Sequence, residues 1–266
     1  MPNTLIQQDA RAQRDALVAA LQILLAAPGI DIATLAADLD ALAAFDVTDG
    51  PGYGAAIAAV FNDYVTALLA VPAPAAPTGN TELTSRGVWP VKDPSQGLAS
   101  FAAYGPLAPA SPSGAAAQSV QNRQALIDVV SGVATAALAS LWAQTDFVSS
   151  DDADAARTQL LALIDTRIDA AAAITDDTLG AAWQQLYGSS ANDLTVRGKQ
   201  LPQLVAYSVG APIPALALAN RLYPDRMIAG DTEAEDIDAL AVNLVARNKA
   251  CHPLFMPMTG EALSAP

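Results

Sequence analysis

The order of apolar and polar residues predicts helices along most of this chain, because apolar side chains recur at spacings of three and four residues. The clearest examples are residues 212–223 and 237–247, where apolar residues repeat at i, i+3 or i+4, and i+7 or i+8. We therefore expect two short helices that face each other. Asn248 follows the second helix where a left-handed cap is favoured, and Pro253 then prevents the helix from resuming.

The same periodicity predicts three helices in the amino-terminal part and three longer antiparallel helices in the second half. These helices are expected at residues 5–27, 32–45, 55–71, 115–146, 153–174 and 176–200. The segment 46–54 has the composition of a turn-rich loop, and a single strand is expected at 201–209. The pattern therefore predicts a mainly α fold composed of helical bundles.

Proline residues suggest how the chain is divided. Eight prolines between residues 72 and 114 interrupt regular structure, with room for one short helix at 98–104. Proline at this density makes either a semi-rigid linker or arm laid over a partner, or a surface loop of the same domain. The expected division is a helical region at 1–71, a Pro-rich linker at 72–114, a three-helix bundle at 115–200 and a carboxyl-terminal module at 201–266.

Composition and charge limit the function. Hydrophobic residues make up 52% of the 266 residues, which is ample for a core, whereas aromatic residues make up only 5%. The 13 basic and 27 acidic side chains give a net charge of −14. Nucleic-acid binding needs a basic surface, and the best basic feature is the pair Arg11 and Arg14. We therefore expect no nucleic-acid partner.

Targeting signals are not evident in the sequence. The first fifteen residues lack the pattern of a signal peptide, and the longest apolar runs, 16–30 and 129–143, are shorter than the roughly twenty residues of a membrane span. Cys251 is the single cysteine, so an intramolecular disulfide cannot form. We expect a protein that is made in the cytoplasm and has no membrane span.

Candidate catalytic chemistry is sparse. The single histidine, His252, directly follows Cys251, and adjacent side chains seldom point at each other productively, so His252 is better explained as a helix-end cap or loop anchor. The serines lack a Gly-x-Ser-x-Gly context, glutamates are few, and the aspartate clusters lack the spacing of a calcium-binding loop. We expect no catalytic residue, no cofactor and no metal site, and a protein that is not an enzyme.

Two segments near the carboxyl end carry a resemblance to a known family. They are LPQLVAYSVGAPIPALALANRLYPD and IDALAVNLVARNKACHPLFMPMTGEAL, and they resemble the closing segments of phage Mu-type DNA circularisation proteins, a family of tail proteins of Mu-like phages. The segments at 28–45, 121–127 and 193–197 resemble others of that family. Typical members begin with a β-rich domain, which this sequence does not lead us to expect.

The resemblance implies a structural component of a bacteriophage tail, located in the virion near the baseplate hub or tail tip. The implied partners are other tail proteins, namely the hub, the tail tube, the baseplate wedge and the tape measure. By analogy with tail rings, a homo-oligomer of three or six copies is expected. A DNA-associated circularisation factor is the alternative suggested by the family name.

The expected order of elements in 201–266 is strand, helix, helix and strand, which resembles the LysM fold, although the closing strand at 260–263 is barely indicated. This resemblance implies peptidoglycan binding as a further alternative to a structural joint. The family-signature residues that we expect to serve assembly are Arg221, Tyr223, Arg247, Asn248, His252, Pro253 and Phe255. Asp193 and Arg197, spaced i, i+4, form a candidate interface pair. If the ring of Phe255 is buried, its truncation should cost roughly 3 kcal/mol.

Overall fold

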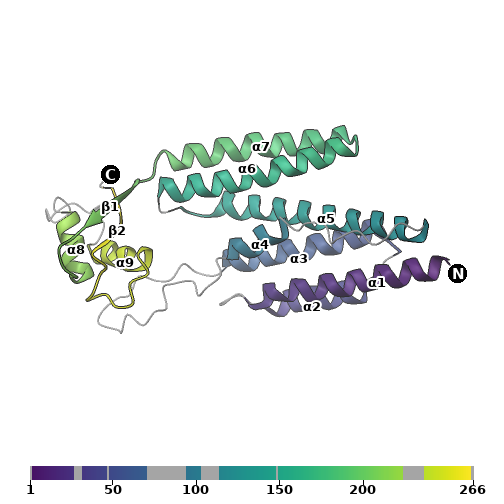
Figure 1. Cartoon of the computed structure of the whole chain (residues 1–266), viewed down its shortest axis with the longest axis horizontal. Coiled ribbons are helices and arrows are strands. Elements are labelled where there is room, and N and C mark those ends of the chain that lie inside the picture. Colours follow the sequence, from purple (N-terminus) through teal and green to yellow (C-terminus); the bar gives the residue numbers. More distant parts are fainter. Residues whose placement is uncertain are drawn as a thin grey trace. The chain divides into compact units, whose positions relative to one another are not determined.

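The computed structural model of the chain describes residues 2–26, 32–46, 48–70, 94–102, 114–147, 149–223 and 237–264. The predicted mainly α fold class is confirmed, since helices account for most of these residues and the described strands form one two-stranded sheet (Figure 1). The helices are α1 (Pro2–Leu21), α2 (Ile32–Ala44), α3 (Gly50–Ala70), α4 (Pro94–Ala102), α5 (Gly114–Gln144), α6 (Ser150–Ala173), α7 (Asp177–Gly198), α8 (Ala215–Leu222) and α9 (Ile237–Arg247), with a 3₁₀ helix η1 (Gln22–Ala26). The strands are β1 (Leu204–Ser208) and β2 (Thr259–Leu263).

The chain forms two compact units. The helical unit contains the described residues within Met1–Val71, Val91–Asp146 and Ala156–Leu194, and the terminal unit contains those within Phe147–Ala155 and Thr195–Pro266. This division differs from the predicted one, because α1 and α3 pack against α5 and so join the amino-terminal helices to the second half of the chain. The predicted linker at 72–114 includes α4, which also packs on α5, and most of its other residues lie outside the described part.

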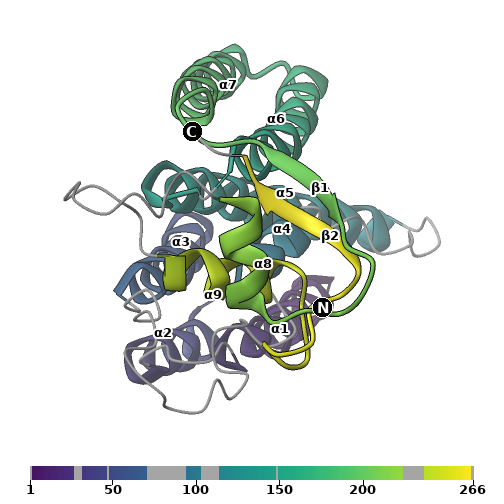
Figure 2. The ribbon, with the colours of Figure 1, turned by 90° about the vertical axis from the view of Figure 1, so that its left-hand side faces the viewer.

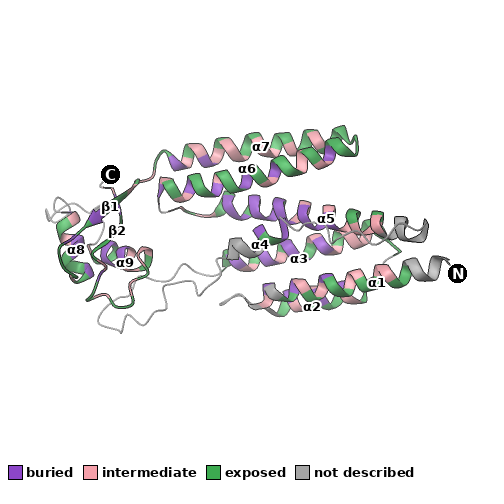
Figure 3. Cartoon of the chain, in the orientation of Figure 1, coloured by how far each residue is buried: buried purple, intermediate pink, exposed green. Residues whose placement is uncertain are grey.

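α5 carries much of the core of the helical unit. Figure 3 shows buried residues over a large part of its length, and Val130, Ala134 and Leu138, spaced four residues apart, are each fully buried. α4 reaches the same core through Phe101, whose ring meets that of Phe61 on α3 edge to face at 5.6 Å between centroids. The buried residues of α5 therefore belong to the surface on which α3 and α4 pack.

α3 begins at Gly50, five residues earlier than predicted. The glycines and proline of 50–54 suggested a loop, but Asp49 caps the helix by accepting a hydrogen bond from the Gly52 N–H at 3.1 Å. Pro51 lies in the first turn, where no intrahelical donor is needed from its nitrogen. A side-chain cap therefore extended this helix into a segment whose composition favoured a turn.

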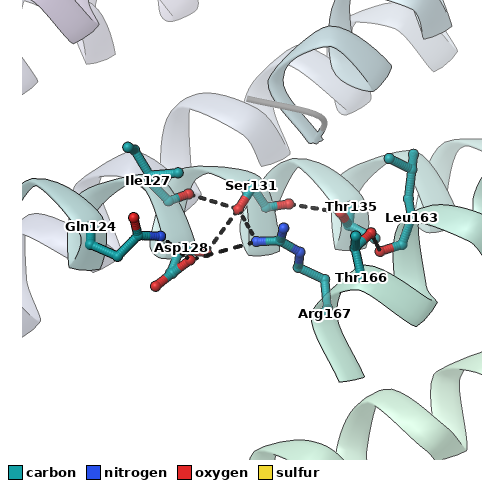
Figure 4. A network of polar contacts seen from close by, with 8 residues as sticks. All are labelled: Gln124, Ile127, Asp128, Ser131, Thr135, Leu163, Thr166 and Arg167. Carbon is teal, nitrogen blue, oxygen red and sulfur yellow. Dashed lines mark hydrogen bonds and ion pairs between the residues drawn. The ribbon is translucent and has the colours of Figure 1, made fainter. Parts of the chain in front are cut away.

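A buried polar network joins α5 and α6 within the helical unit (Figure 4). Ser131 is fully buried, and its hydroxyl donates to the Ile127 carbonyl oxygen at 2.7 Å. The Arg167 guanidinium donates to the Ser131 hydroxyl oxygen and lies 3.9 Å from an Asp128 carboxylate oxygen. Because a buried donor without a partner is costly, this network favours one alignment of α6 along α5.

Two helices in the described part are long and apolar enough to cross a membrane by length and composition, namely Gly50–Ala70 and the Val120–Gln144 part of α5. Buried residues make up 33% and 56% of their most apolar windows. Core helices of globular proteins pass the same test, so the expectation of no membrane span stays a prediction.

The terminal unit has the predicted order strand, helix, helix and strand (Figure 2). β1 and β2 pair antiparallel over five residue pairs, from Leu204 opposite Leu263 to Ser208 opposite Thr259. The closing strand is thus a full partner of β1, although the sequence barely indicated it. α8 and α9 pack on each other and bury a core of eleven residues: Tyr207, Val209, Ala215, Leu218, Ala219, Tyr223, Leu240, Ala241, Leu244, Met256 and Ala262.

Candidate assembly surface of the terminal unit

The pairing of β1 with β2 fixes which backbone groups point into the sheet. Ser264 N–H donates to Gln203 carbonyl at 2.6 Å, and Val209 N–H donates to Met258 carbonyl at 2.7 Å. In an antiparallel pair, the residues between these two bonds alternate between inward and outward backbone groups. Odd-numbered residues of β1 therefore bond to β2, and even-numbered residues direct their N–H and C=O groups away from it.

The outer edge of β2 is covered by side chains. Asn248 accepts a hydrogen bond from the Glu261 N–H and donates one to the Glu261 carbonyl oxygen, each at 2.8 Å. The Tyr223 hydroxyl donates to the Leu263 carbonyl oxygen at 3.0 Å. Two of the signature residues thus satisfy backbone groups that an edge strand would otherwise leave exposed.

Gly260 leaves the space that this arrangement needs. A Cβ atom built there would overlap the Asn248 amide and lie 2.8 Å from the Tyr207 hydroxyl oxygen. Glycine is therefore required by close approach of side chains at this position rather than by backbone conformation.

Two loops of the terminal unit are hydrogen-bonded to each other. Ala215 N–H donates to the Pro253 carbonyl at 2.7 Å, and Met256 N–H donates to the Ile213 carbonyl at 3.0 Å. Met256 is fully buried and so anchors the loop that precedes β2. These bonds hold the 248–258 loop against the 209–214 loop and the first residue of α8.

Large apolar side chains project from this anchored loop. Leu254 is 54% exposed, Phe255 68% and Met258 52%, and we call these three residues the apolar turn. His252 supports the turn by accepting the Leu254 N–H on Nδ1 at 3.1 Å, and its ring lies 5.8 Å from that of Phe255. His252 thus makes a local hydrogen bond within the loop that carries the apolar turn.

Phe255 does not have the buried position on which the predicted stability loss depends. The ring of Phe255 lies on the surface, and the next residue, Met256, occupies the core instead. The expectation for Asn248 also needs correction, since the residue with positive φ after α9 is Lys249, at 49°. Asn248 instead uses its side chain as the link to β2.

The first turn of α6 is attached to the sheet and to α9. Ser149 caps this helix by accepting the Asp152 N–H at 3.1 Å, and an Asp152 carboxylate oxygen lies 3.1 Å from Arg247 Nη2. The neighbouring carboxylate of Asp151 accepts the N–H of Leu204 at 2.8 Å. The partners of these two aspartates are distant in sequence, so no local signal in the sequence indicated the contacts.

The remaining predicted residues lie on α7, on α8 and in the loop before β2. Arg221 is exposed on α8, and the Pro253 carbonyl accepts the Ala215 N–H. Arg197 lies over the ring of Phe147 at 5.5 Å from its centroid. Asp193, one turn earlier on α7, lines an apolar hollow of about 320 Å³ in the helical unit with Trp142, Leu186 and Leu194.

The titratable groups in the described part of the chain include one pair of neighbouring carboxylates, Asp38 and Asp63, in the helical unit. Within that part, no set of three or more His, Cys, Asp or Glu side chains could hold a metal ion. Cys251 is exposed, and burial raises the pKa of Tyr207 above its ordinary value. No model of a known protein family matches the sequence, and no curated protein is significantly similar to it.

Proposed function

We propose that this chain is a structural component of a bacteriophage tail, near the baseplate hub or tail tip, and that it acts as a joint between neighbouring tail subunits. The location comes from the sequence resemblance to Mu-type tail proteins. The observation that carries the role of a joint is the apolar turn, which presents Leu254, Phe255 and Met258 to solvent from a firmly anchored loop.

Exposed apolar side chains that cluster on a rigid support are typical of protein contact surfaces. The turn lies within the part of the sequence that resembles the tail family, between the signature residue His252 and the β2 strand. The hydrogen bonds from Ala215 and Met256 preorganise its backbone, so little conformational entropy would be lost on binding. Its partner would be a neighbouring tail protein or another copy in a ring of three or six.

The location can be tested by electron microscopy of particles that carry a gold-labelled tag at Met1. Gold at the tail tip supports a baseplate component. Complete particles without gold, with the protein left free in the lysate, would refute the proposal. The protein would then be an assembly factor or would act on the host.

Peptidoglycan binding is a second candidate, because the paired β2 strand completes the strand, helix, helix, strand order that resembles a LysM module. The same bonds that join the 209–214 and 248–258 loops would restrict a groove between them, which favours the joint. A pull-down with purified cell wall separates the two functions: a joint stays in the supernatant, whereas a sugar-binding module sediments with the wall.

DNA circularisation is the function that the family name suggests, and we propose that this chain does not bind DNA. Its net charge of −14 opposes the phosphate backbone. A gel shift at physiological salt, weakening steeply as salt is added, would contradict this proposal.

A further inference from the structure

We propose that the outer edge of β1 binds an extended, basic segment of a partner protein, which adds to the sheet as a third strand. This inference goes beyond the proposed place in a phage tail, and it depends only on the backbone of the terminal unit and on the charge of the chain. If the protein is not a tail component, strand addition to β1 can still occur. If strand addition fails, the proposed place in a phage tail is unaffected.

The backbone N–H and C=O groups of β1 that do not bond to β2 belong to its even-numbered residues. Leu204, Ala206 and Ser208 alternate with the residues that bond to β2, so their backbone N–H groups point away from the sheet. The Leu204 N–H donates a hydrogen bond to the Asp151 carboxylate at 2.8 Å. Within the described residues, Ala206 and Ser208 have no hydrogen-bond partner on this edge, and both are exposed.

The other edge of the same sheet is protected. Asn248 pairs with both backbone groups of Glu261, and Tyr223 bonds to the carbonyl of Leu263. A two-stranded sheet with one edge capped by side chains can grow on the other edge only. The asymmetry therefore marks β1 as the docking strand.

β1 also lacks the features that usually prevent strand addition. Its sequence Leu204–Ser208 contains no charged residue, no proline and no glycine. Ala206 and Ser208 have small side chains on the exposed face, so a neighbouring strand could approach without steric conflict. Their backbone groups lie about 7 Å apart, which is the repeat of two residues in an antiparallel strand.

Charge indicates the chemistry of the occupant. The Asp151 carboxylate lies at the start of β1, where it accepts the Leu204 N–H, so one end of the open edge carries a negative charge. The whole chain has a net charge of −14, which opposes the approach of a second copy. A partner segment rich in Lys or Arg would be attracted to the same edge and would supply an opposite charge to Asp151.

The test uses the full chain and a fluorescent, capped seven-residue peptide that alternates lysine and valine. Its anisotropy should rise saturably as the protein is added. A control peptide with the same side chains, N-methylated at alternate residues, lacks the backbone donors of one edge and should bind about tenfold more weakly. Equal binding of the two peptides would mean that charge alone attracts them and would overturn strand addition.

The matched protein variants are Ala206→Pro and Ala206→Ser. The Ala206 N–H is not used by β2, so proline removes only the outward donor and obstructs the edge, whereas serine keeps the donor. We expect the proline variant to lose peptide affinity about tenfold and the serine variant to bind like the original chain. Ser208→Lys, which keeps every backbone group but adds a like charge, should also weaken binding if the proline variant does not fold.

Three further results would overturn the proposal. The first is a folded Ala206→Pro variant, checked by circular dichroism, that binds the peptide like the original chain. The second is preferential binding of a peptide with glutamate in place of lysine. The third is a dimer of the original chain in sedimentation that the proline variant abolishes, since the occupant would then be a second copy.

Discussion

The side chain of Asn248 mimics a neighbouring strand for Glu261. Its amide accepts from the Glu261 N–H and donates to the Glu261 carbonyl, each at 2.8 Å, and it also donates to the Leu244 carbonyl at 2.9 Å. One residue thus ends α9 and covers the edge of β2. This relationship explains why Asn is suited to the position: its amide has two N–H donors for the two carbonyls and an oxygen that accepts the Glu261 N–H.

Replacing Asn248 should therefore weaken the terminal unit. We expect Asn248→Ala to lower the free energy of unfolding by about 1–2 kcal/mol, since three hydrogen bonds are lost but water can reach part of the exposed edge. Asn248→Asp should be at least as harmful, because a carboxylate cannot donate to the two carbonyls. Chemical denaturation followed by circular dichroism measures both, with Asn243→Ala on the same helix as the control. Equal stability of the Asn248 and Asn243 variants would show that the edge contact contributes nothing.

Gly260 offers a sharper steric test. An added methyl group would overlap the Asn248 amide and approach the Tyr207 hydroxyl oxygen, so Gly260→Ala should cost about 1–3 kcal/mol. Gly210→Ala is a matched control, because a Cβ atom there has no neighbour within 4 Å. Thermal melting of the two variants gives the comparison. If both melt alike, the packing around Gly260 is looser than the structure requires.

The raised pKa of Asp38 leads us to expect that the stability of the fold depends on pH. Burial and the nearby carboxylate of Asp63 raise the pKa of Asp38 above its ordinary value of 3.8, so the folded state favours the protonated acid. Its stabilising contribution is greatest below that ordinary value and is lost as the pH rises through the raised folded-state pKa. Asp38→Asn, which stays neutral, should melt at a higher temperature than the original chain near neutral pH.

Melting curves between about pH 4 and about pH 8 test this prediction. The Asp38→Asn variant should show a smaller fall in melting temperature with rising pH, while Asp40→Asn, at an exposed position of the same helix, should follow the original chain. A lower melting temperature of Asp38→Asn at neutral pH would mean that the charged carboxylate stabilises the fold, which is the opposite of the expected effect.

Helical periodicity was sufficient to predict where most helices lie. Residues 237–247 form α9 with the predicted bounds, and the long helix expected at 115–146 is α5 at Gly114–Gln144. Its apolar stripe is visible in the sequence because burial of one side imposes the spacing directly. The early start of α3 was missed, because the cap at Asp49 overrides the turn tendency of the glycines that follow.

The contacts of the candidate surface could be predicted only in part. The signature residues were found by resemblance, but their roles depend on partners far along the chain. Tyr223 donates a hydrogen bond to the Leu263 carbonyl, and Arg247 forms an ion pair with Asp152. β2 was barely indicated because its stability comes from these long-range bonds rather than from its own composition. The exposure of Phe255 was not predictable either, since the adjacent apolar residue, Met256, occupies the core instead.

The most direct test of the proposed joint is to measure how much labelled protein enters purified phage particles when Phe255 is replaced by alanine. Ile174→Ala is the matched control, because Ile174 is exposed to a similar extent, 64% against 68%, but lies in the turn after α6. We expect both variants to melt like the original chain, and Phe255→Ala to be largely missing from particles that incorporate Ile174→Ala normally. Normal incorporation of Phe255→Ala, or absence of the original chain from the particles, would contradict the account.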